Sequence, residues 1–552
     1  MNITSVIING LAFRARLFEE STKDPLRAQE RALFKYLARN RYTEYGLKYN
    51  FSGIKSIADF RSRVPLVDFK DISSYIERMK KGEGNILTAD KVIAFSNTSG
   101  TTGIPKFIPV TRYSRDRKSD LMNLWAYYAS RDHPRVFDGK ILGIISAETE
   151  NRTEGGVSYG AESGVAYNGL PQIMKRLYVL PYGLFYIKDF DARYYCMLRI
   201  AMEHDITTIA TLNPSTIVLL CQRIEALQDR IMGDIEKGTL SKDFKVESDI
   251  RLNIEKTLRP NPKRAGELRA ILEENKKLLP KYFWPNLDLI ECWKGGTVKV
   301  YLKGLPQYFG DVAVRDFGCL STEARSSVPM SDEGAGGVLA IGTNFYEFIP
   351  KEDIDKDNKR VLLCDQVEEG AEYLLIVTTA GGLYRYNMDD VIKVDGFFNK
   401  TPVIEFVQKG HNAISITGEK VYESHVNEAV NRAADRNKIL IKAFCASVAT
   451  GNTSRYVFSV EFYEMPSLDE KRVLLASIEE ELYEENNEYY DLRTEHLLAS
   501  PILSVVKEGE FERYRREKVS QGGHDTQFKL PKLFLKLNFY KEFEIEENIY
   551  LD

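Results

Sequence analysis

The sequence predicts an α/β fold with two domains of unequal size. Short β-rich runs alternate with charged, helix-prone stretches between residues 91 and 280, a pattern typical of parallel strands joined by crossover helices. A second series of strand, polar turn, strand and helix begins near Lys409. We therefore expect a large N-terminal domain with mixed and parallel sheets over residues 1–408, and a small α+β domain over residues 409–552. The length of 552 residues agrees with this division, because it favours two to four domains of ~150 residues each.

The N-terminal half is expected to contain helices first and strands later. The first 20 residues predict a helix that packs on the body, with a weak amphipathic surface anchor as the alternative. Residues 25–45 have apolar positions at helical spacing, and residues 115–130 also read as a helix. Two apolar runs, 140–145 and 206–212, predict buried strands, whereas the charged stretch 222–280 predicts a solvated helical pair.

Short strands are expected to return after residue 287. The runs that predict them are LDLIECW, TVKVYL, VLAIGTNFYEFI, EYLLIVTT and DDVIKV. In the smaller domain, ILIKAFCASV and YVFSVEFYEM predict strands, and residues 467–487 predict a helix.

Composition excludes several classes of protein. Lys plus Arg number 76 and Asp plus Glu number 80, so a nucleic-acid binder with a basic surface is not expected. No run of ~18 apolar residues occurs and the N-terminus lacks the charge order of a signal peptide, so we expect no membrane span and a cytoplasmic location. The six cysteines form no CxxC pair, which disfavours a zinc ribbon. The six histidines form no HExxH or HxH motif, which disfavours chemistry based on a histidine cluster.

A hydroxyl-rich loop is the clearest functional motif. It lies between two β-rich runs, and its glycines, hydroxyls and backbone N–H groups suit phosphate oxygens. The residues expected to bind phosphate are Thr98, Ser99, Gly100, Thr101, Thr102 and Gly103. Lys106 adds a positive charge. The spacing is not that of a Walker A loop, which reads GxxxxGK[ST] and leads into a helix.

This loop, TSGTTGIPK, resembles the phosphate loop of the adenylate-forming superfamily of acyl-CoA synthetases, luciferases and non-ribosomal adenylation domains. Further stretches resemble one branch of it, the auxin-responsive acyl acid–amido synthetases of the Gretchen Hagen family, including their bacterial members. They run nearly the whole chain: RNRYTEYGLKYNFSGIKSIADFRSRVPL, WPNLDLIECWKGG, GCLSTEA, YEFIP, GGLYRYNMDDVIKVDGF and QFKLPK. The resemblance implies a large adenylate-forming domain and a small mobile cap.

The resemblance also implies a ligase that uses ATP and Mg²⁺. Such an enzyme converts a carboxylic acid to an acyl-adenylate and then joins the acyl group to an amino-acid amine. In-line attack by a carboxylate needs cations and positioning but no general base, which agrees with the scarcity of histidine. Two alternatives remain: an acyl-CoA or acyl-protein ligase of the same superfamily, and a non-catalytic nucleotide-binding interaction protein. A monomer or homodimer is expected, and the identity of the acid and of the acceptor stays open.

Several residues in the N-terminal domain acquire expected roles from the resemblance. Gly295 and Gly296 would pack against the adenine, Thr322 would face the phosphates, and Glu323 would ligate Mg²⁺ as a catalytic carboxylate. Read alone, the STEA segment could instead begin a helix as an N-cap.

The segment YRYNMDDVI carries the ribose-binding carboxylate by resemblance. Asp390 would accept hydrogen bonds from the ribose hydroxyls. The family usually has glycine directly before this aspartate, and here Asp389 stands in that place, although the register favours Asp390. Arg385 is included among the nucleotide-binding residues, with a local ion pair as its alternative role.

The C-terminal domain supplies a catalytic lysine by resemblance. The turn QKGHNAISITGEK corresponds to the hinge about which the cap rotates. Lys529 aligns with the lysine that reaches the α-phosphate, and we expect it to be catalytic together with Glu323 and Lys106. Lys518 is the alternative. On the bare sequence, Lys529 could also be a solvated surface charge, because it stands among Lys532, Lys536 and Lys541.

An apolar pocket is expected for the acyl acid. One candidate lining is the stretch SDLMNLWAYYA, with Leu121, Leu124, Trp125 and Tyr128, which could equally be core packing. The other is the stretch GGVSYGAESGVAYNG.

Overall fold

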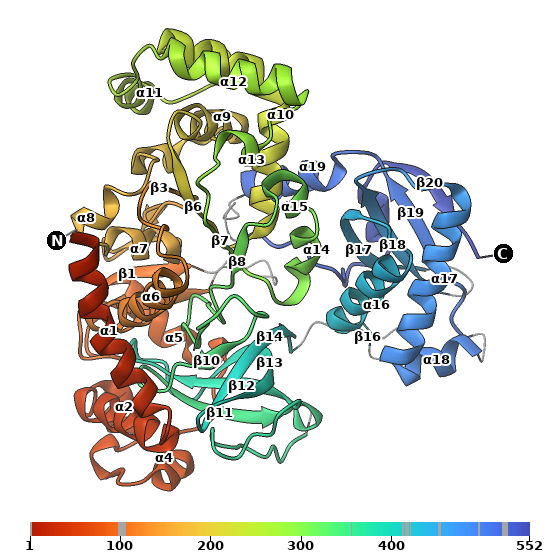
Figure 1. The fold of residues 1–552 in the computed structure, drawn as a ribbon. Coiled ribbons are helices and arrows are strands. Elements are labelled where there is room, and N and C mark those ends of the chain that lie inside the picture. Colours follow the sequence, from red (N-terminus) through yellow and green to blue (C-terminus); the bar gives the residue numbers. More distant parts are fainter. Residues whose placement is uncertain are drawn as a thin grey trace. The chain divides into compact units, whose positions relative to one another are not determined.

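The computed structural model describes residues 3–97, 106–354, 356–410, 413–414, 419, 421–450, 454–494, 497–521 and 528–551 (Figure 1). The chain forms two compact units. The first unit contains residues 1–212, 219–293 and 308–406, and the second contains residues 213–218, 294–307 and 407–552. The predicted α/β class is confirmed, because helices and both parallel and antiparallel strands occur along the chain.

Three sheets form the frame of the first unit. The parallel sheet has the order β3-β6-β7-β8, a second sheet has the order β2-β1-β5-β4, and a six-stranded sheet has the order β11-β12-β13-β14-β10-β9. The strands of the first two sheets are β1 (Val92–Asn97), β2 (Phe107–Thr111), β3 (Lys140–Gly143), β4 (Asn151–Arg152), β5 (Ser158–Gly160), β6 (Ile206–Ala210), β7 (Leu289–Glu291) and β8 (Ala313–Arg315). Those of the third are β9 (Ser327–Val328), β10 (Gly337–Leu339), β11 (Phe345–Pro350), β12 (Glu372–Thr378), β13 (Tyr386–Phe398) and β14 (Thr401–Lys409).

Helices surround these sheets. Those before the parallel sheet are α1 (Ile3–Ser21), α2 (Pro25–Arg39), α3 (Glu44–Lys48), α4 (Ile57–Arg63), α5 (Phe69–Lys80) and α6 (Arg112–Asp132). Those that follow are α7 (Glu162–Asn168), α8 (Gln172–Lys175), α9 (Phe190–Ala201), α10 (Pro214–Lys237), α11 (Ser248–Glu255), α12 (Pro262–Asn275), α13 (Pro280–Phe283) and α15 (Leu305–Phe309). The predicted helices at the N-terminus, within 25–45 and at 115–130 are therefore confirmed, as are the strands at 140–145 and 206–212.

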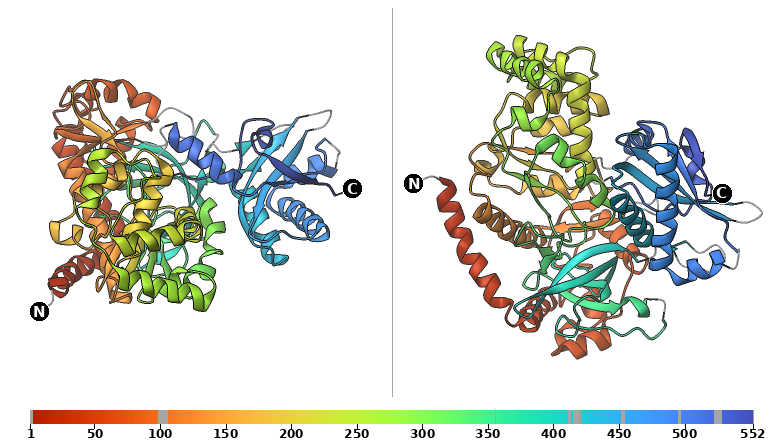
Figure 2. Two further views of the ribbon diagram at one scale, coloured as in Figure 1. Left: turned by 90° about the horizontal axis from the view of Figure 1, so that it is seen from above. Right: turned by 45° about the vertical axis from the view of Figure 1, so that its right-hand side comes forward.

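The first two helices pack on the body of this unit. Figure 2 shows α1 along the outside of the unit, where it packs on α6. Arg14 donates to Asp120 at 2.8 Å, and the Tyr128 hydroxyl donates to Glu19 at 3.1 Å. Helix α2 begins at an Asp24 cap with proline at its first position, which is a favoured start. It packs against β11, where Gln29 accepts a hydrogen bond from the Tyr346 amide at 2.6 Å.

The second unit is a small α+β structure. Its four-stranded sheet has the order β17-β18-β19-β20, with helices α16 and α17 packed against each other. Its strands are β15 (Ala413–Ile414), β16 (Val421–Tyr422), β17 (Ile441–Ala449), β18 (Arg455–Phe462), β19 (Ile502–Val506) and β20 (Ile545–Ile549). Its helices are α14 (Lys299–Leu302), α16 (Glu423–Arg436), α17 (Leu468–Glu485), α18 (Asn487–Thr494) and α19 (Glu510–Ser520).

Two strand predictions were wrong. The run TVKVYL forms a 3-10 turn (Gly296–Val298) followed by α14, and its buried residues Val298 and Tyr301 are three positions apart, at helical spacing. The run VLAIGTNFYEFI is not one strand either. It divides into β10 and β11 around a turn in which the Thr343 amide donates to Ala340 at 3.2 Å.

Within the described part of the chain, no helix is both long and apolar enough to cross a bilayer.

Candidate active site

The two strands that flank the predicted phosphate loop form an antiparallel pair. Strands β1 and β2 pair up to Asn97 and Phe107, so both ends of the loop are held side by side. Helix α6 begins only after β2, at a Thr111 cap, and this strand–loop–strand order differs from the strand–loop–helix of a Walker motif. Lys106 is half-buried, with Nζ 6.0 Å from the centroid of the Phe69 ring. The predicted phosphate ligands Thr98, Ser99, Gly100, Thr101, Thr102 and Gly103 lie outside the described residues.

A tight turn between β8 and β9 carries Thr322 and Glu323. The Ser321 amide donates to the Ala324 carbonyl at 2.9 Å, and Leu320 bridges Arg325. Both Thr322 and Glu323 are buried. The segment is a turn at which no helix begins, so the N-cap alternative was wrong.

One lysine connects this turn to the end of β1. The Lys118 ammonium on α6 donates to the Thr322 carbonyl at 2.8 Å and lies 2.9 Å from the Glu162 carboxylate. Glu162 in turn accepts a hydrogen bond from the Ser96 hydroxyl at 2.5 Å, two residues before Thr98. These linked contacts therefore fix the Thr322 backbone relative to Ser96, just before the predicted phosphate loop.

Asp390 lies on a β-bulge of β13. Leu374 faces Val391 and Ile376 faces Asn387, so the single residue Leu375 opposes three residues of β13. Asp389 has a φ of 58°, in the left-handed region that glycine adopts without strain. This conformation explains why glycine suits position 389. Because of the bulge, the buried Asp390 does not follow the side-chain alternation of an unbroken strand.

Glu323 and Asp390 both act on one tyrosine. Burial raises the pKa of the Tyr386 hydroxyl, and the negative charges of Glu323, Asp68, Asp390 and Asp389 raise it further. The hydroxyl therefore lies within electrostatic range of all four carboxylates. The roles of Glu323 and Asp390 stay predictions.

Arg385 forms a local ion pair, which was its alternative role. Its Nε and Nη2 donate to the two oxygens of Glu347 at 2.8 and 3.0 Å, and Nη1 donates to the carbonyls of Val64 and Arg61. Both side chains are buried. The inclusion of Arg385 among nucleotide ligands is therefore corrected, because its guanidinium is committed to a bidentate ion pair and two carbonyls.

Gly295, Gly296 and Lys529 belong to the second unit. Gly296 has a φ of 62°, and its carbonyl lies 3.4 Å from the Asn427 amide nitrogen of α16. Lys529 is exposed between Phe528, whose carbonyl accepts a hydrogen bond from Asn213, and the buried Leu530.

Lys532 is a buried lysine close to Lys529 in sequence. Its side chain is fully buried, 4.3 Å from the centroid of the Phe444 ring and 5.1 Å from that of Tyr301. Its amide donates to Glu423 at 2.5 Å. Burial lowers the pKa of the Lys532 ammonium to about 8. Three elements contribute these neighbours: β17, α14 and the start of α16.

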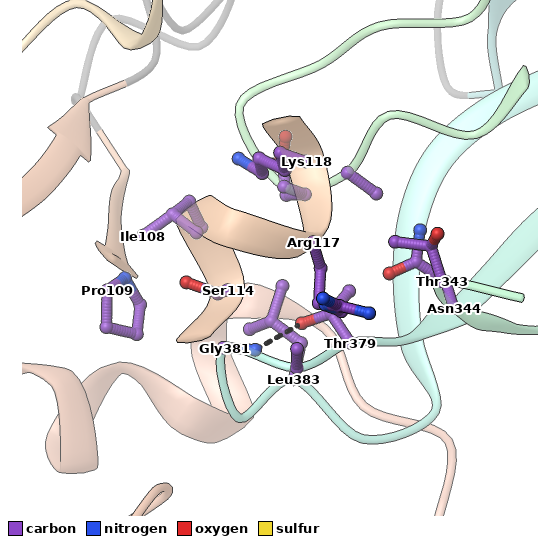
Figure 3. Close-up of a pocket in the computed structure, with 13 residues that line it drawn as sticks. Ile108, Pro109, Ser114, Arg117, Lys118, Thr343, Asn344, Thr379, Gly381 and Leu383 are labelled. Carbon is purple, nitrogen blue, oxygen red and sulfur yellow. Dashed lines mark hydrogen bonds between the residues drawn. The ribbon is translucent and has the colours of Figure 1, made fainter. Parts of the chain in front are cut away.

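A small cavity adjoins the Glu323 turn (Figure 3). Its volume is about 20 Å³, which is room for one water molecule and too little for a nucleotide. Figure 3 shows Arg117 and Lys118 on the helix above it and Thr379, Gly381 and Leu383 on the loop below.

Comparison with known proteins identifies the chain. The GH3 family N-terminal domain matches residues 14–314, the GH3 family central domain matches 337–409, and the GH3 family C-terminal domain matches 424–538. The chain belongs to the GH3 family. The resemblance to the Gretchen Hagen branch is thereby confirmed.

Similar proteins cover nearly the whole GH3 chain. Jasmonoyl–L-amino acid synthetase JAR4 from Nicotiana attenuata is 27% identical over 93% of this chain and 92% of its own length. Indole-3-acetic acid-amido synthetase GH3.4 from Arabidopsis thaliana is 25% identical over 94% and 90%. The solved structure of GH3.15 acyl acid amido synthetase superposes with a TM-score of 0.85 at 24% identity, covering 97% of this chain and 96% of that one. The fold is therefore that of GH3 acyl acid amido synthetases.

The α6 candidates for the acyl pocket of this GH3 chain are core residues. Leu121, Leu124, Trp125 and Tyr128 are all buried in the main apolar cluster. The Trp125 indole donates to the Asp316 carbonyl at 2.8 Å and stacks on Phe317. The core-packing alternative is therefore correct.

The second candidate stretch packs more closely than a flexible loop would. A Cβ on Gly160 would lie 2.1 Å from the Glu148 carbonyl oxygen, and one on Gly164 would lie 2.3 Å from the Glu148 amide nitrogen. Glycine is thus required at both positions. Nearby, Tyr167 stacks on Tyr182 with centroids 5.0 Å apart.

The donor set of this GH3 chain suits Mg²⁺. Mg²⁺ is usually held by one or two carboxylates, substrate phosphates and water rather than by a full protein cage. Glu323 provides one buried carboxylate, and the described residues contain no group of three or more metal-binding side chains. These residues therefore fit an ion that is shared with the nucleotide.

The ribose assignment can be tested by a pair of variants. Asp390→Ala should weaken ATP binding by at least about 100-fold, because two hydrogen bonds to a carboxylate contribute about 1.5–3 kcal/mol each, or about 3–6 kcal/mol together. Asp389→Gly should bind ATP normally and melt at an equal or higher temperature, because glycine relieves the left-handed backbone. Calorimetric titration measures both. Normal binding by Asp390→Ala together with loss in Asp389→Gly would reverse the assignment.

Glu291 predicts a pH dependence of stability. It is the last residue of β7 in the parallel sheet. Burial raises the pKa of its carboxyl to about 8, although the positive charges of Arg315 and Arg325 lower it. A carboxyl with a raised pKa takes up a proton on folding, so its stabilisation is complete at pH 4 and is lost as the pH rises to about 8.

Glu291→Gln should remove this dependence. The free energy of unfolding of the wild type should fall by up to about 1.4 kcal/mol per pH unit between pH 5 and 8 through this group. The variant should lack that contribution and be the more stable chain at pH 8. Urea unfolding at several pH values measures it, and identical pH slopes in both chains would contradict the prediction.

Proposed function

We propose that this GH3 chain is an ATP-dependent acyl acid–amido synthetase, a ligase that adenylates a carboxylic acid and then conjugates it to an amino acid. The observation that carries the proposal is that Glu323 and Asp390 both lie within electrostatic range of Tyr386, in a unit where strands β1 and β2 pair at the ends of the hydroxyl-rich sequence. The names of its relatives, which describe synthesis of jasmonoyl and indole-3-acetyl conjugates, support the same reaction class.

The first step joins the acid to the nucleotide. A carboxylate oxygen of the acid attacks the α-phosphorus of ATP, the bond to the β-phosphate oxygen breaks, and pyrophosphate leaves with the electron pair. Asp390 orients the ribose, Thr322 and the phosphate loop hold the phosphates, and Lys106 and Lys529 place positive charge where negative charge accumulates. Mg²⁺ held by Glu323 would neutralise phosphate charge when it is bound.

The second step forms the amide. The neutral amine of the acceptor attacks the acyl carbon, AMP leaves with the electron pair of the broken bond, and the amine releases a proton to solvent. The acceptor's own nitrogen is the nucleophile, so no covalent enzyme intermediate is needed. We further propose that the small C-terminal domain moves as a cap between the two steps.

The cysteines support chemistry without a thiol. None of the six forms a disulfide bond, and five are buried. Burial raises the pKa values of the Cys196, Cys364 and Cys445 thiols to about 12, so none of these forms a thiolate near neutral pH. Six cysteines without disulfide bonds also fit the reducing cytoplasm, which we propose as the location.

Acceptor-dependent release of AMP tests the proposal. The purified chain is incubated with ATP, Mg²⁺, a panel of carboxylic acids and either mixed amino acids or coenzyme A, and the products are identified by mass spectrometry. We expect an amide product and stimulation by amino acids. Stimulation by coenzyme A alone would favour the acyl-CoA ligase, and ATP binding without pyrophosphate exchange would favour the non-catalytic protein.

A further inference from the structure

Arg325 is a buried cation with an incomplete set of partners. It lies two residues after Glu323, and its side chain is 2% exposed. Nη2 donates to the Phe317 carbonyl at 2.8 Å, and Nη1 lies 2.9 Å from the Met122 sulfur. Nε has no hydrogen-bond partner among the residues that the structure describes. A guanidinium has five N–H donors, and burying them without acceptors costs free energy.

The nearest carboxyl groups do not complete the set. Asp316 and Glu291 lie within electrostatic range of the Arg325 guanidinium. Neither forms a hydrogen bond to it among the described side chains, and Asp316 accepts instead from the Gly318 amide at 2.5 Å. Glu291 is mostly protonated at neutral pH, because burial raises its pKa to about 8. Asp316 therefore opposes the charge of Arg325 from a distance, and the guanidinium keeps an N–H donor without an acceptor among the described residues.

The backbone of Arg325 is held by hydrogen bonds, whereas its guanidinium contacts a weak acceptor that another group can replace. The Arg325 carbonyl accepts hydrogen bonds from Asn344 at 3.2 Å and from the Tyr346 hydroxyl at 3.3 Å. The contact of the head group with Met122 is of another kind, since a thioether is a weak acceptor on a flexible chain. A stronger acceptor could displace that sulfur without moving the backbone.

We propose that Arg325 binds a second carboxylate of the acyl acid, so that the preferred substrate is a dicarboxylic acid. This rests on the proposed function. Two residues of chain span at most ~7 Å, so Arg325 lies within one small molecule's length of Glu323, where the reacting carboxylate would meet the α-phosphate. A bidentate guanidinium–carboxylate pair would supply the missing acceptors.

Matched pairs of acids test this proposal. ATP–pyrophosphate exchange is measured with butanoate against succinate, hexanoate against adipate, and phenylacetate against its 4-carboxy derivative. We expect kcat/KM to be at least about 10-fold higher for the diacid of the best pair, because a site built to bind a polar group rejects the analogue that lacks it. Arg325→Met should remove this preference by lowering diacid exchange, with monoacid exchange unchanged or raised. Arg325→Lys should keep part of it.

The possible outcomes are distinct. No exchange by the wild type with any acid would refute the proposed function itself. Exchange without preference for a diacid in any pair would overturn the dicarboxylate proposal alone, and so would an equal fall for both members of a pair in Arg325→Met, since that would assign Arg325 to the reacting carboxylate. If Arg325→Met does not fold, the wild-type pairs and Met122→Ala decide: the latter should keep the diacid preference, and its loss would count against the proposal.

Discussion

Lys529→Ala is expected to lower ATP–pyrophosphate exchange about 100- to 1,000-fold, the usual effect of removing one group that stabilises charge in a transition state. Lys529 is exposed, and its neighbours Phe528 and Leu530 are held by a hydrogen bond and by burial. The variant should therefore fold normally and bind ATP with little change, because the ribose and phosphate contacts that we propose lie on other residues. Exchange assays and calorimetric titration of ATP measure the two effects separately.

Lys536→Ala is the matched control for that prediction. Lys536 lies on the same segment and is exposed, but its ammonium pairs with Glu542 at 2.5 Å. We expect exchange within about twofold of the wild type, as is usual for an exposed ion pair. Unchanged exchange in Lys529→Ala would refute its assigned role, and a large fall in Lys518→Ala would pass that role to Lys518.

Glu347→Gln is expected to destabilise the first unit by about 3–5 kcal/mol, because it leaves a buried arginine without its counter-charge. Glu347 is 1% exposed, accepts both hydrogen bonds of a bidentate pair from Arg385, and also lies 3.3 Å from Arg61. The effect should appear as a lower urea midpoint and as faster amide exchange in β11, which carries Glu347, and in β13, which begins directly after Arg385.

An exposed pair nearby provides the comparison. Glu352 pairs with Arg360 at 2.5 Å, with 63% and 59% of the side chains exposed, and Glu352→Gln should change the unfolding free energy by less than about 1 kcal/mol. Replacing Glu347 and Arg385 together with apolar residues should cost less than Glu347→Gln alone. Equal destabilisation by Glu347→Gln and Glu352→Gln would contradict the prediction.

The sequence predicts residues whose chemistry is local. Thr322 and Glu323 are adjacent in a short motif, and Asp390 follows a position where the backbone turns left-handed. By contrast, Glu347 and Arg385 are 38 residues apart, and Lys118 meets Thr322 across 204 residues. No periodicity or spacing connects such pairs, so only the fold identifies them.

The same distinction applies to the fold. The helix predicted over 115–130 lies within α6, because a helix of several turns repeats its apolar face many times. The charged stretch 222–280, predicted as a pair, instead holds the end of α10 followed by α11 and α12. The run TVKVYL is too short for such repetition, and its apolar residues fit the period of a strand and that of a helix equally well. The burial of Lys532 was missed for another reason: an amphipathic cation gives no sequence signal when rings of β17 and α14 cover it.

Because most of the cysteine thiols are buried, their reaction with a labelling reagent reports when each unit opens. Cys445 is the single cysteine of the second unit, whereas Cys196, Cys221, Cys292, Cys319 and Cys364 all lie in the first. A buried thiol reacts with an alkylating reagent only when its surroundings open. The rate of labelling at Cys445, followed by peptide mass spectrometry, therefore gives the opening rate of the small unit, and labelling at the other positions gives that of the large unit. Repeating the measurement with and without ATP would show which unit the nucleotide holds closed, with no probe added to the protein.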